Sequence, residues 1–192
     1  DGNFYKCLFQ QERADLSFVP GEDYQNHGNG TVYRETNNDP NSDYSDLANF
    51  ISFISFETNA TIFEGIEHHI NVDNFLRYLA VNVAVGSWDD YWYGSNNYYL
   101  NHNLGTDRFE WVPFDYDNTF GIDFFSTNWS DRHFDDWGDN GFGSTPAPLV
   151  DEVFEHSQWR RQFRRYLYKL ADTLDDPATL AKVDELAALI AP

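Results

Sequence analysis

Two short stretches rich in acids and aromatic rings decide how this sequence folds: "GSWDDYWYGSNNYYL" at 86–100 and "WVPFDYDNTFG" at 111–121. Between them, "HNLGTD" supplies the Asn, Gly and Asp that favour a hairpin loop. The flanking runs, 97–101 and 108–114, are predicted to be strands. Because antiparallel strands return the chain to where it began, we expect the acids of both stretches at one end of the hairpin.

The residues expected to converge there carry carboxylates and one amide: Asp89, Asp90, Asn97, Asp115 and Asp117. Gathered carboxylates raise one another's pKa unless a cation neutralises them. Oxygen ligands of this kind suit Mg²⁺, Mn²⁺ or Ca²⁺, whereas the lack of a Cys or His cluster argues against zinc. Phosphoryl transfer uses such a set, with one carboxylate orienting the attacking hydroxyl and other oxygens holding the metals that bridge the nucleotide phosphates.

Composition limits the partners. The chain has 192 residues, which is enough for one domain with a sizeable core and argues against a second full domain. Its 32 acidic residues against 12 Lys and Arg give a net charge of -20, which argues against nucleic acid and anionic membranes as partners. No apolar run approaches the roughly 20 residues that span a bilayer. The lone cysteine, Cys7, leaves the redox compartment open.

The hydrophobic pattern predicts an α+β fold that is mostly helical, with a small antiparallel hairpin sheet. The helix at 71–85 has the strongest pattern, and an earlier helix capped by Asp43 or Ser45 is expected to bury one face. The buried residues of that earlier helix are Leu47, Phe50, Ile51 and Ile54. The other expected elements are a strand at 3–9, a polar loop at 20–40 anchored by Tyr24 and Tyr33, a long loop at 115–148, and helices at 150–156, 159–174 and 177–190.

A family resemblance rests on the central motifs. "NFLRYLAVNVAVGSWDDYWYGSNNYYL" at 74–100, followed by "FEWVPFDYDNTFGID" at 109–123, resembles the core of the spore-coat-protein-H (CotH) kinase family. This family is an atypical branch of the protein-kinase-like fold. The "DGNFYKC" start and "PLVDEVFEHSQWRRQFRRYLYKL" at 148–170 resemble flanking blocks of the same family, so the resemblance covers nearly the whole chain.

The resemblance implies a role for each candidate residue. Asp89 matches the catalytic-loop aspartate, and Asp115 matches the metal-binding aspartate that corresponds to the acid of a kinase Asp-Phe-Gly motif. Asn97 matches a position for metal or catalytic-loop support. Asp117 and Asn118 are supporting candidates, and we include Asp117 with Asp115 and Asn97 in the predicted metal set.

The family also implies partners. The expected cofactors are ATP with Mg²⁺ or Mn²⁺, Ca²⁺ being an alternative. The expected acceptor is a Ser or Thr hydroxyl of a surface or secreted protein, and the expected location is extracellular or at a cell or spore surface.

One departure from the family concerns the small lobe. Family members carry Arg-Gly-x-Ser and Lys-Lys-Ser stretches upstream of a "GNLYK"-like segment, and these resemble the phosphate-covering loop and the nucleotide lysine. This sequence starts at the corresponding "GNFYK", so residues 1–192 are expected to be a single large-lobe domain that lacks the small lobe and is inactive by itself. Lys6 lies in that segment and is not assigned the role of nucleotide lysine.

Two other functions fit the same residues. Paired carboxylates beside aromatic rings also suit an acid/base glycosidase. A catalytically inactive extracellular adhesion or Ca²⁺-binding module on the same scaffold is the non-enzymatic alternative.

Overall fold

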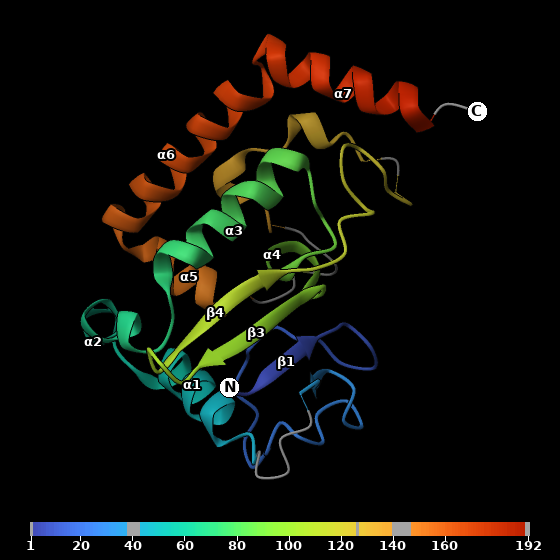
Figure 1. The fold of residues 1–192 in the computed structure, drawn as a ribbon. Coiled ribbons are helices and arrows are strands. Elements are labelled where there is room, and N and C mark those ends of the chain that lie inside the picture. Colours follow the sequence, from blue (N-terminus) through green and yellow to red (C-terminus); the bar gives the residue numbers. More distant parts are fainter. Residues whose placement is uncertain (1, 38–42, 126, 140–146, 191–192) are drawn as a thin grey trace.

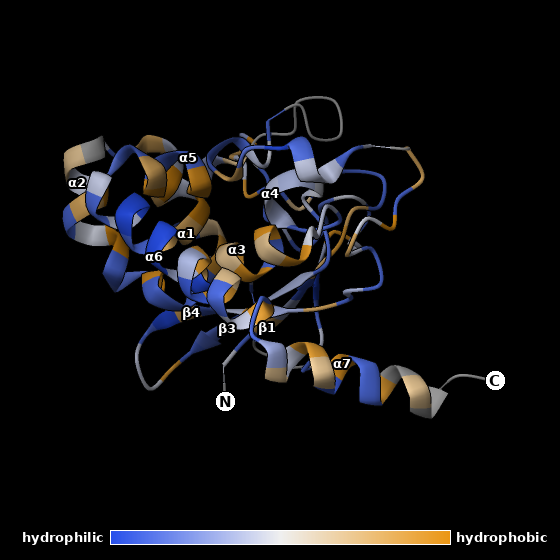
Figure 2. Cartoon of the chain, turned by 90° about the horizontal axis from the view of Figure 1, so that it is seen from above, coloured by the Kyte–Doolittle hydropathy of each residue, from blue (hydrophilic) through white to orange (hydrophobic). Residues whose placement is uncertain are grey.

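The computed structural model describes residues 2–37, 43–125, 127–139 and 147–190, and its centre is a four-stranded antiparallel sheet of order β2-β1-β3-β4 (Figure 1). Figure 2 shows helices α1, α3, α5 and α6 on one side of this sheet. Helix α7 extends away from the rest of the chain in both views. The strands are β1 (Phe4–Cys7), β2 (Tyr33–Glu35), β3 (Tyr98–Asn103) and β4 (Arg108–Pro113).

Helices make up most of the regular structure, so the predicted class, a mostly helical α+β fold, is confirmed. The predicted hairpin is β3 and β4, which pair over six residues each. The helices are α1 (Ser45–Phe56), α2 (Asn59–Gly65), α3 (Val72–Val85), α4 (Tyr91–Gly94), α5 (Pro148–Glu155), α6 (Ser157–Leu174) and α7 (Pro177–Ile190), with 3₁₀ turns η1 (Ile66–His68), η2 (Trp129–Asp131) and η3 (Phe134–Asp136).

Helix α3 follows its local sequence signals. The side chain of Asn71 caps its first turn by accepting a hydrogen bond from the Asn74 amide at 3.1 Å. It ends at Gly86, whose φ of 68° is a left-handed conformation that glycine adopts without a Cβ clash. The predicted helix at 71–85 is therefore correct to within one residue.

Helix α1 buries the predicted face, but its predicted cap is wrong. Leu47, Phe50, Ile51 and Ile54 are all buried. The N-cap residue is Tyr44, in a left-handed conformation with φ 58°, rather than Asp43 or Ser45. The Tyr44 ring is buried and its hydroxyl accepts a hydrogen bond from the Glu35 amide, so tertiary packing fixes this end of the helix.

Three short elements were not predicted. Strand β2 has three residues and lies inside the predicted 20–40 loop, where Tyr24 and Tyr33 are buried as expected. Helix α2 and the four-residue helix α4 were also missed. Elements of three or four residues are too short to show a hydrophobic period, so the sequence pattern gives no signal for β2 or α4.

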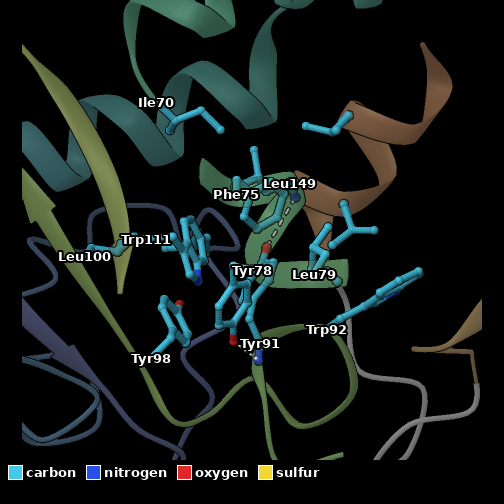
Figure 3. Packing of buried hydrophobic residues seen from close by; sticks show 14 of the residues in the cluster. Ile70, Phe75, Tyr78, Leu79, Tyr91, Trp92, Tyr98, Leu100, Trp111 and Leu149 are labelled. Carbon is cyan, nitrogen blue, oxygen red and sulfur yellow. Dashed lines mark hydrogen bonds between the residues drawn. The ribbon is translucent and has the colours of Figure 1, made fainter. Parts of the chain in front are cut away.

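An aromatic cluster joins the hairpin to α3. Trp111 on β4 stacks on Tyr98 of β3, with 4.8 Å between ring centroids, and meets Phe75 of α3 at 4.6 Å (Figure 3). Tyr91 of α4 packs on the same indole at 5.1 Å. All four rings are buried, and burying a large aromatic side chain contributes roughly 1.5–3 kcal/mol. The cluster therefore packs the hairpin against α3 and α4, so the site residues before β3 and after β4 are attached to the same hydrophobic core.

A polar contact around Asp46 fixes the end of the hairpin that lies opposite the predicted site. The Asp46 carboxylate of α1 accepts hydrogen bonds from Tyr5 Oη at 2.6 Å and Asn3 Nδ2 at 2.9 Å, and lies 2.9 Å from His102 Nδ1. Burial opposes ionisation of Asp46, but the bonds from His102, Tyr5 and Asn3 hold its pKa below the usual value. The hydrogen bond to Asp46, against partial burial, raises the pKa of His102. The charged imidazole of His102 and the ionised carboxylate of Asp46 therefore stabilise each other.

This contact predicts a pH-dependent contribution to stability. His102→Gln should lower the free energy of unfolding by about 1 kcal/mol near pH 5.5, where His102 and Asp46 are both charged. Because the folded pKa of His102 is raised, its contribution is complete below about 6.5 and is lost as the pH rises through the folded value. The contribution of Asp46 is present above about 3.9 and is lost as the pH falls through its lowered pKa.

Urea unfolding of the wild type and of His102→Gln at several pH values measures this difference. The control is His68→Gln, at an exposed histidine that lines the same surface pocket as Asp46 and His102. A loss of stability in His102→Gln that is equal near pH 5.5 and pH 8.5 would contradict the role of the charged imidazole.

Candidate active site

The two adjacent aspartates at the end of α3 have different surroundings. Asp90 is the N-cap of α4, where its Oδ1 accepts a hydrogen bond from the Tyr93 amide at 2.9 Å, and its side chain is buried. Burial raises the pKa of Asp90 to about 7. Asp89 is only half-buried. The cap turns Asp90 toward the interior and leaves its neighbour available to the site.

Three asparagine amides hold the Asp89 carboxylate. Asn96 Nδ2 donates to Oδ1 at 2.7 Å, and Asn97 Nδ2 donates to Oδ2 at 2.9 Å. Asn118, which follows β4, donates to the same Oδ2 at 3.3 Å. The structure thus brings together residues from before β3 and after β4, as the antiparallel geometry predicts.

Burial is the main cause of a raised pKa at Asp89, opposed by the hydrogen bonds from Asn96 and Asn118. The nearby charges of Asp117 and Asp115 raise it further. These two acids are exposed and lie in the loop that follows β4. The predicted site residues therefore share one electrostatic environment, with Asp89 at its more buried side.

Two residues of the candidate site have a left-handed backbone conformation. Asn97 and Asp115, on the two sides of the hairpin, have φ values of 52° and 57°. Outside glycine this left-handed conformation costs about 1–2 kcal/mol per residue, although Asn and Asp tolerate it best. Such a conformation persists only where surrounding contacts fix the backbone.

The loop after β4 is attached to the end of α3 by hydrogen bonds. The Phe120 amide donates to the Val85 carbonyl at 2.7 Å, and Trp88 Nε1 donates to the Ile122 carbonyl at 2.8 Å. Phe120 and Ile122 nevertheless expose their side chains, as do Phe124 and Phe125. An apolar surface therefore adjoins the acidic site.

The donor atoms fit a hard cation. Asp89, Asp115, Asp117 and Asn97 offer only oxygen ligands, and the two exposed carboxylates are accessible to an ion. Across residues 2–37, 43–125, 127–139 and 147–190, no three His, Cys, Asp or Glu side chains form a ready metal-binding group. Mg²⁺ rarely needs one, since it usually binds through one or two carboxylates together with water and substrate phosphates.

Sequence reasoning identified Asp89 and Asn97 but missed Asn96 as a partner of Asp89. The "NN" dipeptide at 96–97 before β3 was the available signal, because its two amides donate to different oxygens of the carboxylate. The contacts of Asn82 with Asp90 and Tyr116 were also missed, because Asn82 lies within the regular helical pattern of α3. The roles assigned to Asp89, Asn97, Asp115 and Asp117 stay predictions.

Within the part of the chain that the structure describes, no helix combines the length and apolar composition needed to cross a membrane.

Comparison with known proteins identifies relatives. The sequence profile described as "CotH kinase protein" matches residues 1–192. "Inner spore coat protein H" of Bacillus subtilis (strain 168) is 30% identical over 109 residues, which cover 57% of this chain and 27% of that protein. "Invasin CotH3" of Rhizopus delemar is 23% identical over 128 residues, covering 64% of this chain and 21% of that protein.

The matched regions therefore span about a quarter of the length of these curated relatives. The profile match includes both acidic stretches, the hairpin and the terminal helices. The chain therefore belongs to the CotH kinase protein family.

Proposed function

We propose that this chain is part of an atypical protein kinase that transfers the γ-phosphate of ATP to Ser or Thr hydroxyls of a surface or secreted protein. The observation that carries the proposal is the Asp89 carboxylate, which is held by asparagine amides and has the charges of Asp115 and Asp117 nearby. Phosphoryl transfer uses one carboxylate to orient the attacking hydroxyl and others to hold the metal, so this arrangement supports the proposal. Membership of the CotH kinase protein family supports it. Similarity to a spore coat protein and an invasin supports a surface location.

The proposed role of Asp89 is to accept a hydrogen bond from the hydroxyl of the protein acceptor. A carboxylate offers about four lone-pair positions, and the amides of Asn96, Asn97 and Asn118 use three of them. About one position is left to accept the hydrogen bond of a substrate hydroxyl. The raised pKa, caused chiefly by burial, makes Asp89 a better proton acceptor than an exposed aspartate.

Asp115 and Asp117 are the proposed ligands of the nucleotide-bound metal, with Asn97 in support. A bound Mg²⁺ or Mn²⁺ would supply charge neutralisation for the β- and γ-phosphates. The two carboxylates are exposed, so they can hold an ion that keeps part of its shell for water and phosphate. Their charge also explains why a nucleotide would bind here only together with a cation.

Asp115→Asn in the full-length protein should weaken metal-dependent ATP binding at least about tenfold, because it removes a charge that neutralises the ion. Calorimetry with ATP and Mg²⁺ or Mn²⁺ measures the loss. Asp172→Asn, the same change on the exposed surface of α6, is the matched control. Unchanged metal-dependent affinity in Asp115→Asn would remove Asp115 from the metal site.

Asp89→Asn should spare ATP binding and reduce the transfer rate by about 10²–10⁴-fold, since it removes the carboxylate that orients the hydroxyl. Radiolabel transfer to a protein acceptor, measured at saturating ATP and metal, checks the rate. Equal losses of binding in Asp89→Asn and Asp115→Asn would show that the proposed division of roles is wrong.

Residues 1–192 alone should neither bind ATP tightly nor transfer phosphate, because a net charge of -20 repels phosphates and a kinase cleft takes cations and backbone donors from its small lobe. Radiolabel transfer by residues 1–192, compared with the same residues fused to the Arg-Gly-x-Ser and Lys-Lys-Ser segment of a family member, tests this. Robust metal-dependent autophosphorylation by residues 1–192 alone would refute the large-lobe proposal.

An adhesion module is the second candidate, favoured by similarity to a protein named an invasin. It predicts cell binding that survives both Asp89→Asn and Asp115→Asn. The glycosidase alternative gains no support from the family match.

A further inference from the structure

We infer that Asn82 is a positioning residue that joins the Asp89–Asp90 turn to the loop carrying Asp115 and Asp117. It lies on α3 and contacts both segments through one side-chain amide. Its significance for phosphate transfer rests on the proposed function, but the positioning itself does not.

The amide of Asn82 is used at both ends. Its Nδ2 donates to Asp90 Oδ2 at 2.7 Å, and its Oδ1 accepts a hydrogen bond from the Tyr116 hydroxyl at 2.5 Å. Asn82 is 1% exposed and Asp90 is 2% exposed, so the bond between them is shielded from water. Because the Asn82 Nδ2 group is used in the bond to Asp90, the amide carbonyl of Asn82 faces Tyr116.

The Tyr116 hydroxyl is suited to the donor role. The phenol of Tyr116 carries an O–H donor, and the amide oxygen of Asn82 can only accept, so the hydrogen bond between them runs from Tyr116 to Asn82. A half-buried phenol costs free energy unless it is hydrogen-bonded, which favours the bond to Asn82. The chain of bonds therefore runs in one direction, from Tyr116 through Asn82 to Asp90.

Each end of this chain fixes one half of the candidate site. The Asp90 carbonyl accepts hydrogen bonds from the Gly94 and Asn96 amides, both at 3.0 Å, and so organises the turn that presents Asp89 and Asn96. Tyr116 lies between Asp115 and Asp117, and its carbonyl accepts a bond from Thr119 Oγ1 at 2.9 Å. Without the hydrogen bonds of Asn82, the loop that carries Asp115 and Asp117 should move more freely relative to the turn that carries Asp89.

Tyr116→Phe tests the link with little change in packing, because it deletes one hydroxyl and keeps the ring. Tyr168→Phe, on the exposed surface of α6, is the matched control. In the full-length protein we expect about tenfold faster hydrogen exchange of amides 115–120 in Tyr116→Phe, with exchange in α6 unchanged. We also expect about tenfold weaker Mn²⁺-dependent ATP binding, seen as a raised KM for ATP with a smaller change in kcat.

Asn82→Leu supplies the second arm. If one chain of bonds acts, adding Tyr116→Phe to Asn82→Leu should accelerate exchange of amides 115–120 no further, because neighbours in one network are not additive. Exchange at 115–120 that matches the Tyr168→Phe control would overturn the inference, as would fully additive effects. If Asn82→Leu does not fold, Tyr116→Phe alone decides.

The two readouts separate this inference from the proposed function. A wild-type protein that binds no nucleotide defeats the kinase proposal, yet faster exchange confined to 115–120 in Tyr116→Phe would still support the positioning role. Exchange that rises throughout α3, α6 and the sheet would show a general loss of stability and contradict it.

Discussion

The pairing of Tyr98 with Pro113 at one end of the β3–β4 ladder sets the position of the candidate site. Asn97 lies directly before this pair, and Asp115 follows two residues after it. Because side chains alternate along a strand, a slip of one residue would turn Tyr98 or Trp111 away from α3 and separate the two site segments. The burial that selects the register of the hairpin therefore also assembles the polar groups.

Packing dominates hydrogen bonding at the centre of this arrangement. Trp111 is 2% exposed, and among the described residues its buried Nε1 has no hydrogen-bond partner. An unsatisfied donor of this kind costs roughly 1–3 kcal/mol. Ring contacts with Tyr98, Phe75 and Tyr91 offset the cost. The ring contacts that pack the hairpin against α3 thus outweigh the missing hydrogen bond of Trp111. Helix α3 in turn leads into the turn that carries Asp89.

The parts of the fold that sequence reasoning predicted are those with a repeated local signal. The period of α3 and the turn residues between β3 and β4 gave both elements and the convergence of their ends. Strand β2 and helix α4 depend on tertiary contacts and left no such signal. The same holds for the site: Asp89 and Asp115 stand in recognisable motifs, whereas the role of Asn82 follows only from the packing of α3 against the loop.

The chemistry of the amides around Asp89 explains how an acidic chain can keep a usable carboxylate. An arginine or lysine beside Asp89 would neutralise its charge and lower its pKa, which weakens a proton acceptor. Neutral Asn amides orient both oxygens while leaving the negative charge in place. That charge adds to those of Asp115 and Asp117, so the proposed metal ion would meet more negative charge here than at an ion-paired carboxylate. The asparagine amides thus fix the geometry of the Asp89 carboxylate without neutralising its negative charge.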